Sequence, residues 1–230
     1  MSSVGQRGLT LSTIAAFLRL GHKYDMDFLC AEATTRLAHE FPSTLQRWDD
    51  VENSRTLVTD IGPMCDIINL ARANNTPKLD HIIPAAFYFC CQANNFKGVL
   101  GDFETQPTKY NSDDQKAFIL GWDSLVQKQA EETFSWLVGQ NTMVPFCLSK
   151  KACTSAKQTL RLQLFLPRTK CIALYPWQSD WEQGMCGNCV SAAKRYHEEG
   201  RQRIWNDLPL FFGLPRWDKL LERDGTRVDG

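Results

Sequence analysis

The stretch STIAAFLRLGHKY, residues 12–24, sets the first expectation for the fold. Its apolar side chains recur at intervals of three and four residues, which places them along one face of an α-helix. That face holds Ile14, Phe17, Leu18, Gly21 and Tyr24. Threonine or serine at positions 10, 12 or 13 supplies an oxygen that can cap the start of the helix. The stretch therefore predicts an amphipathic helix.

The same spacing recurs along most of the chain. We expect further helices near residues 27–39, 43–51, 64–71, 78–93, 112–138, 179–196 and 205–212, and a final helical turn over 217–221 after a break at Gly213 and Pro215. Residues 158–167 are ambiguous, because leucines alternate there with other side chains as in a strand. We favour a helix for this segment because its neighbours are helical. The fold class predicted from these patterns is all-α and bundle-like.

Two helical regions are expected, one over residues 10–95 and one over residues 112–225. Residues 94–111, which are polar and contain two glycines and a proline, are expected to form the hinge between them. Six of the seven tryptophans lie in the second region. Trp122 shares a narrow helical arc with Phe118 and Leu125. If it is a core residue, its replacement by alanine would cost about 3–5 kcal/mol; a change within about 0.5 kcal/mol would place it on the surface, in a groove for a partner.

Charge and composition exclude several classes of function. Lys and Arg number 26, as do Asp and Glu, so no overall positive field attracts nucleic acid. The longest apolar run, Ile82–Cys91, is shorter than the roughly 20 residues that a membrane helix needs. The first residues, MSSVGQRGLTLS, contain no apolar run that could serve as a secretory signal. We therefore expect an intracellular protein, in the cytoplasm or nucleus, that binds neither nucleic acid nor a membrane. Its nine cysteines are then free thiols or metal ligands rather than disulfides.

The segment MCGNC, residues 185–189, holds the most informative pair of cysteines. On a helix over about residues 179–196, Cys186 and Cys189 share one face, whereas His197 lies about 16 Å further along the axis. His197 therefore cannot join Cys186 on one ion. Cys147 and Cys153 complete a set of four thiolates that suits a structural zinc. The alternative is that all four are small, buried apolar side chains without a metal.

A thiol oxidoreductase that uses Cys186 and Cys189 is the enzyme hypothesis. A C-x-x-C pair becomes reactive at a helix N-terminus, where the first thiol is acidified. A helix that begins near Ser179 would place this pair in its middle, which argues against that chemistry. The chain contains no nucleophile elbow, no phosphate-binding glycine loop and no H-E-x-x-H motif, so we expect no catalytic residues.

One family resemblance adds to this reading. FLRLGHKYDMDFLCAEATTRL, residues 17–37, resembles the helices that follow the core of BTB/POZ domains. The order and spacing of further segments are similar to one large group of fungal BTB domain-containing proteins. These segments are FPSTLQRW (41–48), INLARANN (68–75), IIPAAFYFCC (82–91), MCGNC (185–189) and GRQRIWNDLPLFFGLPRW (200–217).

The resemblance implies interaction rather than catalysis. In that family an α/β dimerisation core precedes the helix of residues 12–24, and we expect that core to be largely missing here. The family also tends to carry cysteines near both halves of the set of four. The leading expectation is a non-enzymatic, adaptor-like protein–protein interaction module of BTB/POZ type, truncated and without a cofactor. A zinc-stabilised helical interaction domain is the alternative within the same class.

Overall fold

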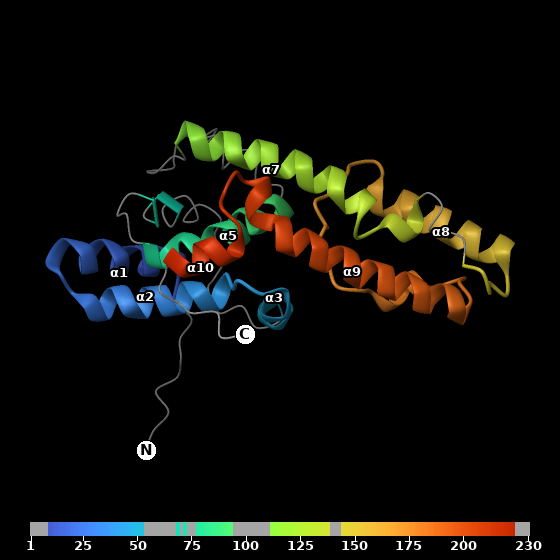
Figure 1. Ribbon diagram of the computed structural model, residues 1–230, viewed down its shortest axis with the longest axis horizontal. Coiled ribbons are helices and arrows are strands. Elements are labelled where there is room, and N and C mark those ends of the chain that lie inside the picture. The colour runs from blue at the N-terminus through green and yellow to red at the C-terminus, as the bar shows by residue number, and fades with distance from the viewer. Residues whose placement is uncertain are drawn as a thin grey trace, which may run out of the picture. The chain divides into compact units, whose positions relative to one another are not determined.

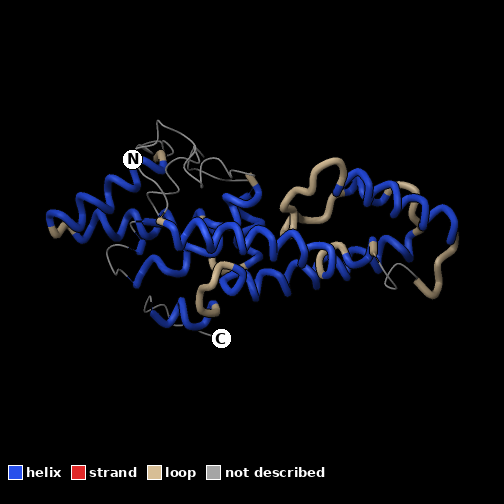
Figure 2. Tube along the Cα trace, turned by 90° about the horizontal axis from the view of Figure 1, so that it is seen from above, coloured by secondary structure: helices blue, strands red, loops and turns tan. Residues whose placement is uncertain are grey.

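The computed structural model describes residues 9–52, 68–69, 71–72, 77–93, 111–138 and 144–223. Over these residues the chain forms helices and loops and no strand (Figure 2), which confirms the all-α prediction. No helix in this part of the chain combines the length and apolarity needed to cross a membrane.

The chain divides into two compact units. Unit 1 comprises Met1–Phe118 together with Phe212–Gly230, and unit 2 comprises Ile119–Phe211. The division falls within helix α7 (Ser112–Glu131), and the end of the chain belongs to unit 1. These boundaries differ from the regions 10–95 and 112–225 expected from sequence, which stay a prediction. All but the last residue of the expected hinge, 94–111, lies outside the described residues.

Unit 1 is built from short helices. Its described elements are α1 (Leu11–Tyr24), α2 (Asp27–Glu40), α3 (Leu45–Glu52), η1 (Pro77–Ile82), α5 (Ile83–Gln92), the start of α7, and α10 (Trp217–Arg223). Helices α1 and α2 lie side by side (Figure 1), and α10 packs on η1. Aromatic side chains fill the core. Trp48 meets Tyr88 edge to face at 5.5 Å between ring centroids, and Phe87 stacks on Phe212 at 5.0 Å.

Helix α1 follows its sequence pattern closely. The backbone N–H of Thr13 donates to the hydroxyl of Thr10, the expected type of cap, at 3.2 Å. Ile14, Leu18 and Gly21 are buried as predicted, and Phe17 is half-buried. Tyr24 is not buried: it is the last residue of the helix and is 59% exposed.

The start of α7 is capped by Asn111 and Asp114. Ser112 and Gln115 also have the spacing of a capping box, but the structure uses the pair one residue earlier. The N–H of Asp114 donates to the Asn111 side-chain oxygen at 2.8 Å, and the Asn111 amide donates back to the Asp114 carboxylate at 2.8 Å. The buried carboxylate of Asp114 also pairs with Arg72, at 2.7 Å from Nε. This ion pair favours Asp114, which is buried, over the half-buried Gln115 as the inward-facing residue.

Unit 2 contains the remainder of α7, η2 (Ser135–Leu137), α8 (Lys150–Phe165), η4 (Ser179–Glu182) and α9 (Gly187–Phe211). Helix α8 covers most of the ambiguous residues 158–167 and confirms the helical interpretation. Two helix boundaries were predicted wrongly. The helix expected to reach Val138 ends at Glu131 and is followed by a turn and η2. The helix expected over residues 179–196 is broken, because Gly184 takes a φ of +76° between η4 and α9.

An irregular segment whose residues 171–174 are buried runs through unit 2 between α8 and η4. Buried backbone polar groups need partners, and side chains from α7, from the turn after it and from α9 supply them. Gln129 receives the N–H of Ile172 and donates to the carbonyl of Lys170, both at 2.9 Å. Thr133 donates to the carbonyl of Ala173 at 2.6 Å, and Arg201 donates to that of Leu174 at 3.0 Å.

An aromatic cluster packs beside this segment. Phe134, Trp136, Trp177 and Trp181 make edge or tilted ring contacts with centroid separations of 5.1–5.6 Å.

None of the seven tryptophans is largely exposed, but Trp122 is only half-buried. It therefore lies at the edge of the core rather than at its centre.

Candidate metal centre

The four cysteines singled out by the sequence converge at one end of unit 2. The Sγ atoms of Cys147, Cys153, Cys186 and Cys189 all lie within 4.8 Å of one another. A zinc ion with four Zn–S bonds of about 2.3 Å requires tetrahedral S–S edges of about 3.8 Å. The observed separations are therefore close to those of a site for a single ion. The Cys147 and Cys186 sulfurs, at 4.0 Å, are almost at this distance already.

Cys147 and Cys153 are positioned by the start of α8. Cys147 lies in a turn, where its N–H donates to the carbonyl of Val144 at 3.1 Å. Cys153 lies in the first turn of α8, with its N–H on the carbonyl of Ser149 at 2.9 Å. The five residues between the two cysteines complete the turn and begin the helix. This geometry explains why a spacing wider than the usual two to four residues still brings the thiols together.

Cys186 and Cys189 are positioned by the start of α9. Cys186 immediately precedes the helix and accepts its first backbone bond, from Val190 N–H at 3.0 Å. The N–H of Cys189 donates to the Cys186 thiol, which thus occupies the capping position that Ser or Asp commonly fills. The sequence had placed this pair in the middle of a helix. This pair instead lies at the N-terminus of α9, and Cys153 lies in the first turn of α8; the partial positive charge of a helix N-terminus favours thiolates.

Direct contacts join the two halves of the site. The backbone N–H of Cys186 donates to the Cys153 sulfur at 3.2 Å, and the N–H of Leu148 donates to the Cys186 sulfur. The side-chain amide of Asn188 donates to the carbonyl of Phe146 at 2.7 Å. N–H groups directed at sulfur orient metal ligands and stabilise their negative charge. Because these donors are mostly backbone groups, sequence reasoning did not identify them.

The four thiols differ in acidity. The N–H groups of Cys189 and Leu148 lower the pKa of Cys186 to about 6. Burial raises the pKa of Cys153, and burial together with the neighbouring thiols raises that of Cys189. Four thiolates so close together repel one another, and a divalent cation is the group that would let all of them ionise. The donor set is entirely soft sulfur, which suits zinc rather than magnesium or calcium.

Other candidate ligands lie outside this cluster. Both ring nitrogens of His197 contact backbone carbonyls, Nδ1 that of Thr133 at 3.1 Å and Nε2 that of Tyr175 at 2.8 Å. His197 therefore lies apart from the four thiols, as its distance from Cys186 along a helix predicted. Cys171 is also buried but does not belong to the group of four.

The described part of the chain is thus a two-unit helical protein with one cluster of four thiols. Searches of the known protein families, of the curated proteins and of the solved structures found no match. The function must therefore be argued from the cluster and its surroundings.

Proposed function

We propose that the chain is a non-enzymatic protein-interaction module whose unit 2 is stabilised by one zinc ion on Cys147, Cys153, Cys186 and Cys189. The observation that carries the proposal is the convergence of four thiols within 4.8 Å. All four positions of a tetrahedral ion would be taken by protein ligands, as in structural zinc sites, leaving none for water or substrate. Of the two interaction-class hypotheses, this geometry favours the zinc-stabilised one.

The interaction role is supported by two further features. Residues 17–37 resemble the helices that follow the core of BTB/POZ domains. BTB/POZ domains are a family of interaction domains. Exposed apolar side chains also occur in both units, such as Phe28 at 66% and Phe146 at 80% exposure. Large exposed apolar side chains are typical of binding surfaces when they cluster.

Metal analysis of protein purified without chelator tests the zinc site. We expect close to one zinc per chain, and substitution by Co²⁺ should give the visible absorption of tetrahedral thiolate coordination. Cys189→Ala should abolish binding, because it removes a buried ligand. Cys171→Ala is the matched control, since it removes an equally buried thiol outside the cluster. Metal-free protein, or equal zinc content in both variants, would contradict the proposal.

A thiol oxidoreductase remains the second candidate, because the structure supplies the feature that the sequence appeared to lack. Cys186 lies at a helix N-terminus and its pKa is lowered to about 6. In such an enzyme Cys186 and a second thiol would pass two electrons and two protons to a disulfide substrate and become a disulfide themselves. Reduction of one equivalent of a small disulfide such as oxidised glutathione by the reduced protein, lost in Cys186→Ser, would favour this reading. Tight zinc binding without this reduction would exclude it.

A further inference from the structure

Helix α8 and the segment that follows it lie in a part of the chain without acidic residues. Residues 133–179 contain no Asp or Glu, although the whole chain has 26 acidic and 26 basic residues. The basic residues of this stretch are Lys150, Lys151, Lys157, Arg161, Arg168 and Lys170. All of them except Lys157 are exposed. The surface of α8 and of the segment after it is therefore cationic.

The arginines at the end of α8 differ from the basic residues of α9. The ion pairs of α9 include Lys194–Glu182, Arg201–Glu198 and Arg203–Glu132, with N–O distances of 2.6–2.7 Å. Within the described residues, by contrast, no ion pair involves Arg161 or Arg168. These two guanidinium groups are available to a carboxylate of another molecule.

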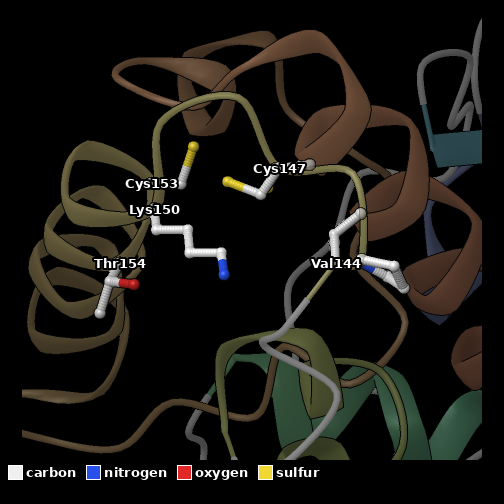
Figure 3. Close-up of a pocket in the computed structure, with 7 residues that line it drawn as sticks. Val144, Cys147, Lys150, Cys153 and Thr154 are labelled. Carbon is white, nitrogen blue, oxygen red and sulfur yellow. The ribbon is translucent and has the colours of Figure 1, made fainter.

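The start of α8 has different surroundings from its end. Lys150 extends into the space beside Cys147 and Cys153 (Figure 3). A zinc ion on four thiolates would carry two negative charges there, which would offset those of Lys150 and Lys151. Leu166, at the end of the helix, follows Cys153 by about 20 Å at 1.5 Å per residue. The positive charge at that end is therefore the less compensated.

Two exposed leucines lie between the two arginines. Leu162 is 57% and Leu166 is 61% exposed. They are one helical turn apart, since the N–H of Leu166 donates to the carbonyl of Leu162 at 3.0 Å. Arg161 directly precedes Leu162, and Arg168 follows Leu166 by two residues. We call these four residues the α8 end patch.

We propose that the α8 end patch binds a short acidic segment of a partner protein. Each guanidinium group can donate two parallel hydrogen bonds to a carboxylate, and the leucines contact apolar side chains that lie between the carboxylates. Four side chains present much less than the roughly 800 Å² that each partner contributes to a standard interface, so the patch suits a peptide segment. The inference names a partner class for the proposed interaction role and rests on that role, but not on the zinc ion.

The leucines favour this partner over a nucleic acid, and the rest of α8 favours it over a membrane. Binding to nucleic acid depends largely on contacts from Lys and Arg to phosphates, in which leucines take no part. A helix that lies on a membrane presents an apolar face along its length. The exposed residues in the middle of α8 are instead polar, namely Thr154, Ser155, Gln158 and Thr159.

Fluorescence anisotropy of a labelled synthetic peptide tests the inference on the full, zinc-loaded chain. The acidic peptide repeats the unit Glu-Glu-Leu, and the reference peptide carries Gln in place of every Glu. The wild type should bind the acidic peptide with a dissociation constant on the order of 10–100 µM. It should bind the reference peptide at least about tenfold more weakly, because the reference peptide has no carboxylates for the arginines.

Variants of α8 locate the binding. The double variant Arg161→Gln, Arg168→Gln should bind the acidic peptide about tenfold more weakly, and Leu162→Ser about fivefold more weakly. The double variant Lys150→Gln, Lys151→Gln is the matched control, because it removes the same charge from the same helix outside the patch. It should bind within about twofold of the wild type. All variants should keep the wild-type circular dichroism spectrum and zinc content.

Three results would overturn the inference: no binding of the acidic peptide by the wild type, equal affinity for the two peptides, or equal affinity of the two double variants. Binding of a labelled DNA duplex, or of phosphatidylcholine vesicles containing phosphatidylserine, through the two arginines and in place of the peptide would also overturn it and assign the patch to that partner. Metal analysis of the same samples tests the zinc site separately, so that a zinc-loaded chain without peptide binding refutes the acidic partner alone.

Discussion

Two effects oppose each other at the ring of His197. The carbonyls of Thr133 and Tyr175 favour the protonated ring, because only an imidazolium donates to both. Burial favours the neutral ring and is the larger effect, and it lowers the pKa of His197 to about 4. Arg201, four residues on and also buried, acts in the same direction as burial, whereas Glu198 opposes it.

This balance predicts how stability depends on pH. An unfolded histidine has a pKa of about 6.5, so between that value and about 4 the unfolded chain binds a proton that the folded chain does not. The stabilising contribution is complete above pH 6.5 and is lost as the pH falls toward 4, by at most about 3 kcal/mol. Urea unfolding at pH 7 and pH 5 measures it.

His197→Gln is the control, since it keeps a polar side chain but does not titrate. Thiolate ligands also lose stability in acid, and subtracting the variant's pH dependence removes that contribution. A wild type whose corrected stability increases toward pH 5 would show that the buried ring is cationic.

Sequence reasoning grouped the four cysteines that the structure places within 4.8 Å of one another, and their binding of a metal stays a prediction. It missed the role of His197 for a physical reason. Cysteines can be identified as candidate metal ligands by residue type alone, and few ways of combining two pairs of cysteines suit a metal. The partners of His197 are backbone carbonyls 64 and 22 residues away. Every residue carries such a carbonyl, so no pattern in the sequence marks these two.

Among the elements, α9 shows what local pattern can and cannot predict. Its apolar periodicity was visible, but its start was not, because a 3₁₀ turn at Ser179–Glu182 has a similar composition to a helix start. The break depends on the positive φ of Gly184, which a sequence can suggest but not establish. This eight-residue error reversed the placement of Cys186 relative to the helix N-terminus.

Gly200 in α9 is predicted to be essential for packing. A Cβ atom there would lie 2.5 Å from the carbonyl carbon and oxygen of Glu132 and 2.6 Å from the N of Thr133. Backbone atoms cannot move aside easily, so Gly200→Ala should destabilise unit 2 by about 1–3 kcal/mol. Gly187→Ala is the control: a Cβ there meets nothing within 4 Å, and its stability should be unchanged or raised by about 0.4–1 kcal/mol. Similar unfolding midpoints for the two variants would contradict the close approach.

The aromatic cluster of unit 2 gives a second comparison. Phe134 is fully buried and contacts the rings of Phe165, Trp181 and His197. Phe134→Ala should cost about 3–5 kcal/mol. Trp122→Ala, which would cost as much if Trp122 were a central core residue, should cost less than about 2 kcal/mol because Trp122 is half-buried. Denaturant unfolding measures both, and a larger loss for Trp122→Ala would show that it is a central core residue.

At the scale of the whole molecule, the all-α class could be predicted because helical periodicity extends over most of the chain. The division into units could not, because it depends on which distant segments meet. Phe212, near the end of the chain, stacks on Phe87 in unit 1, and nothing in the spacing of either residue indicates that pairing.

Removal of the proposed zinc ion should therefore lower the protection from hydrogen exchange in unit 2 and leave that of unit 1 unchanged. All four proposed ligands lie in unit 2, whereas the ring pairs of unit 1, Trp48 with Tyr88 and Phe87 with Phe212, contain no ligand.

Hydrogen exchange followed by mass spectrometry, with and without a strong chelator, measures the effect along the chain. We expect faster exchange at residues 144–155 and 184–193, where the thiols hold the starts of α8 and α9. Residues 11–40 should exchange at unchanged rates, because local opening is confined to the elements that lose their contacts. Uniform loss of protection would show that the chain unfolds as one cooperative body, and no change would show that the metal contributes nothing to the fold.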